Sequence, residues 1–263
     1  MVRPQTAMKV VILAGGLGTR LSEVTELRPK PMVEIGDEPI LWHIMKSYAH
    51  HGFREFVVAL GYKGDVIKRY FLDLRALGGS LKIDLASGAV HHYETMKEDW
   101  TVHCVETGLQ SNTGGRLRRL RDWIGNETFL CTYGDGVSDV DVPALVAFHK
   151  KVGRAATVTA VRPPARFGGL EFDGDLVRAF TEKPQIGEGW INGGFMVLEP
   201  KVLDHLTRDE DSLEIQALEK LAAAGQLAAY KHDRFWQCMD TLRDVRYLER
   251  LWAEGKAPWK VWR

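Results

Sequence analysis

Residues 10–21, VVILAGGLGTRL, pass directly from an apolar run into a loop that contains three glycines. The run from residue 9 to residue 14 is continuous and rich in β-branched side chains, as in a strand that is buried on both faces of a parallel sheet. The loop after it exposes several backbone N–H groups without side chains in the way, and such a loop can hold phosphate oxygens. The stretch therefore predicts a central strand with an anion-binding turn at its carboxyl end.

The alternation of strand and helix continues through residue 161. Further strands are predicted at 55–60, 100–106, 128–133 and 156–161, and helices at 39–48, 64–74, 116–124 and 142–152. This succession is typical of the α/β class, with a Rossmann-like, doubly wound, mostly parallel sheet. In the C-terminal half, three strand-like pieces between residues 167 and 198 are separated by short polar turns. They predict a smaller mixed or antiparallel elaboration, followed by helices at 213–224 and 241–254 and a strand at 227–231.

Composition narrows the class of protein. The chain has 263 residues, of which 45% are hydrophobic, enough for one large domain with its own core. Lysine plus arginine total 35, as do aspartate plus glutamate, and this balance argues against nucleic acid or an anionic membrane as partners. Three widely spaced cysteines, Cys104, Cys131 and Cys238, predict buried free thiols in a reducing compartment. Because no apolar stretch approaches the ~20 residues of a membrane span, we expect a cytoplasmic protein.

Two familiar phosphate-binding loops do not match the glycine loop. The dinucleotide fingerprint needs a third glycine where this chain has Leu21, which argues against a dehydrogenase. The Walker loop ends in Gly-Lys-Ser or Gly-Lys-Thr, whereas this loop ends in Gly18, Thr19 and Arg20. Arg20 and Lys30, the latter between two prolines, suit a polyphosphate whose charge grows in a transition state. Taken alone, the same residues also allow an ordinary turn with solvated basic side chains.

Two aspartates are candidate ligands for a divalent cation. Asp135 lies between two glycines after the strand at 128–133, at the carboxyl edge of the sheet where ligands bind. Asp240 lies at a predicted strand-to-helix junction, so its alternative role is to cap the helix. Mg²⁺ takes one or two carboxylates and completes its shell with phosphate oxygens and water. His91 and His92 are adjacent without evident partner ligands, which argues against a metal site there.

Six motifs occur in a specific order along the chain. They are LAGGLGTRL, PKPM, TYGDG, EKP, NGGF and FWQCMDTLRD, between residues 13 and 244. Together they resemble the sugar nucleotidyltransferases, most of all those members that use CTP, and the similarity extends over residues 8–262. The resemblance implies transfer of a cytidylyl group from CTP to a sugar 1-phosphate, with glucose 1-phosphate expected first, giving a CDP-sugar and pyrophosphate. Another sugar phosphate, or UTP or dTTP in place of CTP, stays open, whereas the presence of both cations and both aspartates disfavours a binding protein without turnover.

The resemblance also implies a role for each matching residue. Arg20 and Lys30 would be the catalytic cations on the phosphates of CTP, and Asp135 and Asp240 would hold the cofactor Mg²⁺. The nucleotide would contact Leu13, Ala14, Gly15, Gly16, Gly18, Thr19 and Arg116. The sugar phosphate would contact Glu182, Lys183, Asn192, Gly193 and Glu214. Residues 8–161 would then form the nucleotide-binding core of a single domain, and residues 162–263 its sugar-phosphate-binding and helical part.

One segment departs from the pattern of the family. Where members that use CTP have a Trp-Glu followed by Glu-Pro, this chain has Leu213-Glu214 and Gln216-Ala217. Because this segment lies by the sugar in the family, we expect the loss of a large aromatic wall to admit a different or bulkier sugar phosphate. The family is commonly oligomeric, often hexameric. The tryptophans near the C-terminus, Trp259 and Trp262, are compatible with packing or with an oligomer contact.

Overall fold

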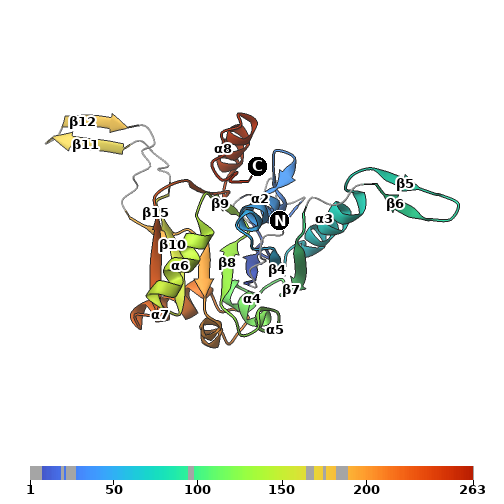
Figure 1. Cartoon of the computed structure of the whole chain (residues 1–263). Helices are drawn as coiled ribbons and strands as arrows, with labels where there is room; N and C mark the ends of the chain where they lie inside the picture. The colour runs from blue at the N-terminus through green and yellow to red at the C-terminus, as the bar shows by residue number, and fades with distance from the viewer. Residues whose placement is uncertain are drawn as a thin grey trace.

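The computed structural model describes residues 8–18, 21, 28–93, 98–163, 169–173, 176–181 and 189–262. Its centre is an eight-stranded sheet in the order β13-β10-β14-β8-β1-β4-β7, with β15 paired to β10 (Figure 1). The strands of this sheet are β1 (Val10–Leu13), β4 (Glu55–Leu60), β7 (Thr101–Glu106), β8 (Phe129–Tyr133), β10 (Ala156–Val161), β13 (Ile191–Asn192), β14 (Met196–Leu198) and β15 (Leu227–His232).

The pairing in this sheet is mostly parallel. Strand β1 lies between β4 and β8 and is parallel to both, β7 is parallel to β4, and β15 is parallel to β10. The short strands β13 and β14 run antiparallel to β10, and β14 also runs antiparallel to β8. The predicted α/β class with a mostly parallel sheet is confirmed, and the C-terminal half supplies the antiparallel members.

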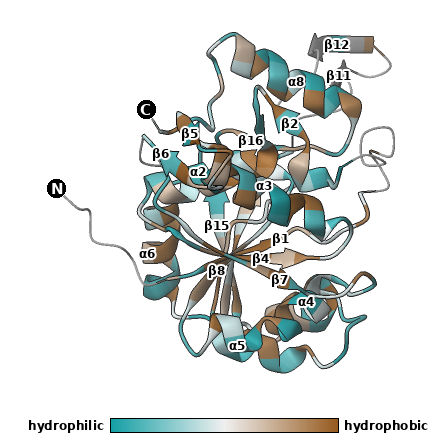
Figure 2. Cartoon of the chain, turned by 90° about the vertical axis from the view of Figure 1, so that its right-hand side faces the viewer, coloured by the Kyte–Doolittle hydropathy of each residue, from teal (hydrophilic) through white to brown (hydrophobic). Residues whose placement is uncertain are grey.

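Both faces of the sheet are covered, as the apolar run of β1 predicts. Val10 and Ile12 belong to one buried cluster, beneath α2 (Ile40–His50) and α6 (Val142–Val152). Val11 and Leu13 belong to the other, with α4 (Thr113–Arg119), α5 (Arg121–Ile124) and the helical turns after β14. Figure 2 shows the apolar strands of the sheet between helices that carry both hydrophilic and hydrophobic residues. Successive side chains of a strand point to opposite faces of the sheet. Because both faces are buried at β1, every residue of that strand has to be apolar.

The end of the chain packs inside the molecule. After α8 (Leu242–Ala253), Trp259 is fully buried and Trp262 nearly so, in the cluster that includes α2. The indole Nε1 of Trp259 donates to His43 Nδ1 over 3.3 Å. Burial lowers the pKa of His43 to about 4. These tryptophans therefore serve internal packing.

Several elements differ from the sequence prediction. The helix expected at 116–124 begins at Thr113 and is divided at Leu120 into α4 and α5. The helix expected from residue 213 begins as a π-helical segment, Leu213–Glu219, and continues as α7 (Lys220–Ala223). Strand pairs that the sequence did not predict are β2–β3 (Glu34–Ile35, Glu38–Pro39), β5–β6 (Leu81–Ile83, Val90–His92) and β9–β16 (Gly136–Ser138, Trp236–Cys238).

Two hairpins project from the body of the molecule, β5–β6 at the end of α3 (Gly64–Leu77) and β11–β12 (Gly169–Asp173, Leu176–Thr181) (Figure 1). The antiparallel pairing of β11 with β12 confirms the mixed segment expected there. All three cysteines are free: Cys131 is buried, and Cys104 and Cys238 are half-buried. Among the described helices, none is long and apolar enough to cross a membrane.

Candidate active site

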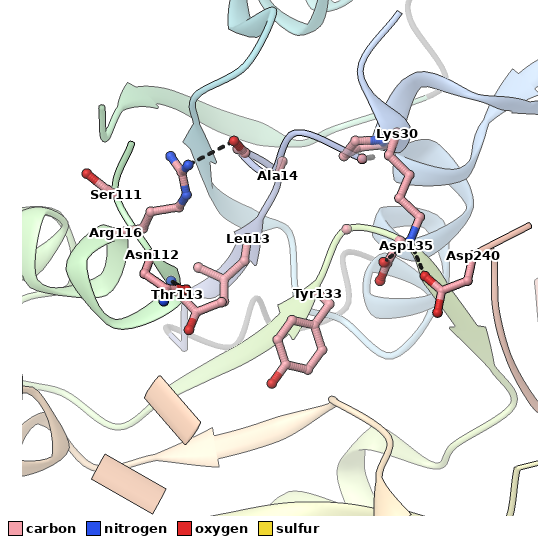
Figure 3. Close-up of a pocket in the computed structure, with 15 residues that line it drawn as sticks. Leu13, Ala14, Lys30, Ser111, Asn112, Thr113, Arg116, Tyr133, Asp135 and Asp240 are labelled. Carbon is pink, nitrogen blue, oxygen red and sulfur yellow. Dashed lines mark hydrogen bonds and ion pairs between the residues drawn. The ribbon is translucent and has the colours of Figure 1, made fainter. Parts of the chain in front are cut away.

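A cavity of about 400 Å³ opens at the carboxyl ends of β1 and β8 (Figure 3). This is the edge of a parallel sheet where the topology leaves room for a ligand. Among the described residues, fifteen line it: Leu13, Ala14, Gly15, Gly16, Gly18, Lys30, Pro31, Ser111, Asn112, Thr113, Arg116, Tyr133, Gly134, Asp135 and Asp240. Nine of them were predicted from the sequence as nucleotide, catalytic or metal residues. Thr19, Arg20, Glu182 and Lys183, also predicted, lie outside the described residues.

Arg116 binds the backbone of the glycine loop, residues 15–18, through its buried guanidinium. Its guanidinium is nearly buried and donates to the carbonyl oxygens of Leu60, Gly108 and Gly15 at 3.0, 2.7 and 2.8 Å. A further bond of 2.9 Å goes to the hydroxyl of Thr107. Burial lowers the pKa of Arg116, and the charge of Arg119 lowers it further. One side chain thereby connects the last residue of β4 with the segments that follow β1 and β7.

This contact explains why residue 15 is glycine. A Cβ at Gly15 would lie 2.2 Å from Nη1 of Arg116, and one at Gly61 would lie 2.5 Å from the same atom. Gly16 has nothing within 4 Å of such a Cβ, and Gly18 has φ +66°, a conformation that favours glycine. The loop therefore approaches an arginine of its own chain at Gly15, and it leaves open space at Gly16. That Arg116 also contacts a nucleotide stays a prediction.

Lys30 lies on the opposite wall of the cavity and bridges two carboxylates. Its Nζ is 2.6 Å from Oδ2 of Asp135 and 2.5 Å from Oδ1 of Asp240 (Figure 3). The lysine begins a short 3₁₀ turn directly after Pro29, with Pro31 next in the chain. Burial by itself lowers the pKa of Lys30, but the two carboxylates together raise it above its ordinary value. The ammonium is therefore the cation of a partly buried triad.

Asp240 is not the cap of the helix that follows it. Thr241 caps α8 and forms a capping box with Asp244, so the side chain of Asp240 turns to Lys30 instead. The N–H of Met239 donates to the backbone carbonyl of Asp135 over 2.8 Å, which ties the two aspartate-bearing segments together. The capping alternative raised by the sequence is thus wrong for Asp240.

The two carboxylates suit a magnesium ion that a substrate helps to coordinate. Oxygens of Asp135 and Asp240 both lie within hydrogen-bond distance of one atom, so they are close enough to share one small cation. Among the described residues, no group of three or more His, Cys, Asp or Glu side chains could hold a metal by itself. Mg²⁺ needs only one or two carboxylates when phosphate oxygens and waters fill its other positions. The donor set fits that ion.

Glu214 and Asn192 meet at one tyrosine of the cavity wall. The hydroxyl of Tyr133 donates to Glu214 Oε1 and accepts from Asn192 Nδ2 at 3.2 Å. Thr113 and Ser212 donate to the other oxygen of Glu214 at 2.7 and 2.6 Å. Burial raises the pKa of Glu214, but these three hydroxyl groups outweigh burial and lower it below its ordinary value. Glu214 and Asn192 therefore both contact Tyr133, which lines the cavity, and their binding of a sugar phosphate stays a prediction.

Leu213 does not form a wall of the described cavity, and a widened sugar site at this position stays a prediction. Leu213 is fully buried in the core cluster with Leu206, and it is not among the residues that line the cavity. A Cβ at Gly114 would lie 2.7 Å from a methyl of Leu206 and 3.0 Å from the backbone nitrogen of Leu213, so α4 packs tightly there. Leucine in place of tryptophan at position 213 therefore affects the packing of the core and not the described wall of the cavity.

Sequence reasoning missed several lining residues. Tyr133, the last residue of β8, was quoted in a motif without a role, and its place directly before Gly134 and Asp135 was the available signal. Ser111, Asn112 and Thr113 form the start of α4, where Asn112 accepts from the N–H of Thr113 as its cap. An Asn before a helix is a recognisable start signal, but only the fold brings that helix end to the cavity.

Comparison with known proteins gives consistent findings. A family model described as nucleotidyl transferase matches residues 9–252. A glucose-1-phosphate cytidylyltransferase of Salmonella typhi is 51% identical over 256 residues, covering 97% of this chain and 100% of the relative. A probable glucose-1-phosphate cytidylyltransferase of Bacillus subtilis (strain 168) is 44% identical with the same coverage. Among solved structures, HddC from Yersinia pseudotuberculosis has a TM-score of 0.69 and 24% identity, covering 93% of this chain and 99% of that one, a likeness of fold.

Proposed function

The chain belongs to the nucleotidyl transferase family, and we propose that it transfers the cytidylyl group of CTP to α-D-glucose 1-phosphate, forming CDP-glucose and pyrophosphate. The observation that carries the proposal is the convergence of the glycine loop, Lys30 and the two aspartates on one cavity. Identity of 51% over nearly the whole length to a relative named for this activity supports the choice of substrates.

The reaction we propose is an in-line displacement at phosphorus. A phosphate oxygen of the sugar 1-phosphate forms a bond to the α-phosphorus of CTP, and the bond from that phosphorus to the pyrophosphate oxygen breaks. The nucleophile is already an anion, so no general base has to remove a proton. The main barrier is the repulsion between two polyanions, and the protein lowers it by aligning them and supplying positive charge.

The residues of this chain divide that task. Backbone N–H groups of the loop at residues 15–18 are proposed to bind phosphate oxygens, because a Cβ at Gly16 would meet nothing within 4 Å and the space there is open. Lys30 neutralises charge at the α-phosphate, and Arg20 and Lys183 are proposed to act on the β- and γ-phosphates and on the sugar phosphate. Asp135 and Asp240 would hold Mg²⁺, which when bound supplies a Lewis acid to phosphate oxygens. Glu182, Asn192, Gly193 and Glu214 are proposed for the sugar side.

We also propose that the protein works as a homo-oligomer, a hexamer by analogy with its family. The supporting observation is a set of exposed apolar side chains between residues 72 and 93, on α3 and the β5–β6 hairpin. Figure 1 shows this hairpin projecting from the body of the molecule. The side chains are Leu72, Leu77, Ile83, Leu85, Val90 and Tyr93, each more than half exposed. Apolar patches of this kind mark contact sites between proteins. Light scattering after size exclusion measures the mass, and a monomer would contradict the proposal.

The test of the function is pyrophosphate release with Mg²⁺, using CTP, UTP, dTTP and GTP in turn against a panel of sugar 1-phosphates. We expect CTP with glucose 1-phosphate to have the highest kcat/KM, by about tenfold or more, which corresponds to about 1.4 kcal/mol. Absence of pyrophosphate with every pair would contradict the transfer reaction. A preference of similar size for another triphosphate would contradict the choice of base only.

A further inference from the structure

The ammonium of Lys30 occupies the position between the two proposed metal ligands. Its distances to Asp135 and Asp240, 2.6 and 2.5 Å, are those of charge-assisted hydrogen bonds to both carboxylates at once. Among the described residues, these two side chains are the only recorded partners of the ammonium. The lysine thus balances one of the two negative charges of this pair from within the protein.

This arrangement is constrained on both sides. The Lys30 side chain is only 13% exposed and starts from a turn next to Pro29 and Pro31, which limit the backbone. The two carboxylates are connected through the bond between Met239 and Asp135, so they cannot separate freely. Two carboxylates held this close repel each other unless a cation lies between them. Either the lysine or a metal ion can supply that cation.

The two cations exclude one another. A magnesium ion on Asp135 and Asp240 would lie against the same two carboxylates that Lys30 pairs with, and an ammonium left beside a dication would be repelled. The lysine therefore needs another anion before it can leave. The neighbouring cavity wall, from Leu13 to Gly18, is where the proposed function puts the phosphates, and a lysine binds phosphate as a mobile point charge.

We propose that Lys30 substitutes for the divalent cation in the free protein, so that the metal binds to Asp135 and Asp240 only together with a triphosphate that draws the lysine away. The inference rests on the proposed function for the identity of that triphosphate. Lys30 then changes its partners during the reaction. It holds the two carboxylates together before the substrate arrives, and it moves to the phosphates when the triphosphate binds. Premature metal binding is thereby prevented.

Binding of Mn²⁺ to the free protein, measured by the electron paramagnetic resonance of unbound Mn²⁺, tests the proposal without turnover. We expect weak binding by the wild type and binding at least about tenfold tighter by Lys30→Met, because the competing charge is gone. Lys30→Arg keeps the charge and should stay weak. Lys46→Gln is the matched control. Lys46, in α2, pairs with Glu98 at 2.6 Å and does not line the cavity.

Two further measurements locate the effect and guard against misfolding. The double variant Lys30→Met with Asp240→Asn should lose the added Mn²⁺ affinity, which assigns it to this site. In the wild type, CTP should raise Mn²⁺ affinity beyond that of CTP for Mn²⁺ in solution, a result that needs no variant. Equal Mn²⁺ binding by wild type and a folded Lys30→Met protein would overturn the proposal. Loss of pyrophosphate release with the Mn²⁺ pattern intact would instead overturn the proposed function.

Discussion

Arg116 and Lys30 face the same cavity from opposite walls, and their partners differ in charge (Figure 3). Arg116 donates to neutral oxygens, the carbonyls of Gly15, Leu60 and Gly108 among them. Lys30 pairs with two ionised side chains, Asp135 and Asp240. The first set of bonds is complete within the protein, whereas the second involves groups that we propose also bind a metal ion and a phosphate.

The difference indicates how the two walls work. The wall at Arg116 is assembled before any ligand binds, because the arginine joins the carboxyl end of β4 to the loops after β1 and β7 through bonds that no substrate has to replace. The wall at Lys30 is expected to change its ionic contacts during the reaction, because Asp135 and Asp240, which pair with Lys30, are also the proposed ligands of Mg²⁺. Substitutions on the first wall should therefore affect stability and substrate binding together, and substitutions on the second should affect turnover most.

The largest expected effect is at the wall of Lys30. Asp240→Asn removes one of the two charges proposed to bind the divalent cation, so we expect kcat to fall on the order of 1000-fold, equivalent to roughly 4 kcal/mol. Pyrophosphate release measures it. Asp204→Asn is the control, since Asp204 pairs with Arg121 on the surface at 2.9 Å. A loss below about fivefold, or roughly 1 kcal/mol, at Asp240 would remove this carboxylate from the site.

The next effect separates the two walls directly. Arg116→Lys keeps the charge but loses the forked geometry that reaches several carbonyls, so unfolding in urea should become easier by about 3 kcal/mol. The KM for CTP should rise as the loop loosens. For Lys30→Met we expect the opposite pattern from Arg116→Lys: kcat falls strongly, and the free energy of unfolding falls less. If the two variants lost stability and turnover in the same proportion, the contrast between the walls would be wrong.

A smaller effect is expected at neighbouring glycines. Gly15→Ala introduces a Cβ 2.2 Å from Nη1 of Arg116, and this overpacking should cost roughly 2 kcal/mol of stability. Gly16→Ala meets open space in the protein, so stability should stay the same while the KM for the triphosphate rises. In an Arg116→Lys background the cost of Gly15→Ala should shrink, since the two sites are in contact. If the stability losses of the two substitutions simply added in the double variant, the proposed contact between the loop and Arg116 would be contradicted.

The smallest effect concerns acid stability. The pKa of Glu214 is lowered in the folded protein, so its contribution to stability is present above the ordinary value of 4.5 and is lost as pH falls through the lowered pKa. Glu214→Gln should therefore cost about 1 kcal/mol at neutral pH and less as the pH drops below 4.5. Urea unfolding at several pH values measures it. A cost independent of pH would show that packing, and not ionisation, is at work.

Much of the fold followed from local patterns. The unbroken apolar run of β1 required burial on both faces, and Gly134-Asp135 directly after β8 indicated a ligand-binding edge. The capping box at Thr241 and Asp244 was also visible in the sequence, and applying it would have freed Asp240 from the capping role. These signals are local, and they need only the residues within one turn or strand.

The remaining features depend on contacts between distant segments. No spacing rule connects Arg116 to the carbonyl of Gly15, since the bond spans 101 positions of the chain. Lys30 and Asp240 are separated by 210 positions, so their pairing is decided by the sheet order and not by a motif. Leu213 was expected at the sugar because of its alignment with a tryptophan, whereas tight packing against α4 puts it in the core.

The measurement that tests the central claim most directly is a crystal structure with CTP and Mn²⁺, using the anomalous signal of manganese to locate the ion. The account predicts manganese on the carboxylates of Asp135 and Asp240, with the triphosphate along the loop at residues 13–18 and Lys30 moved onto a phosphate oxygen. A structure in which Lys30 still bridges both aspartates, while manganese and triphosphate lie elsewhere, would contradict it.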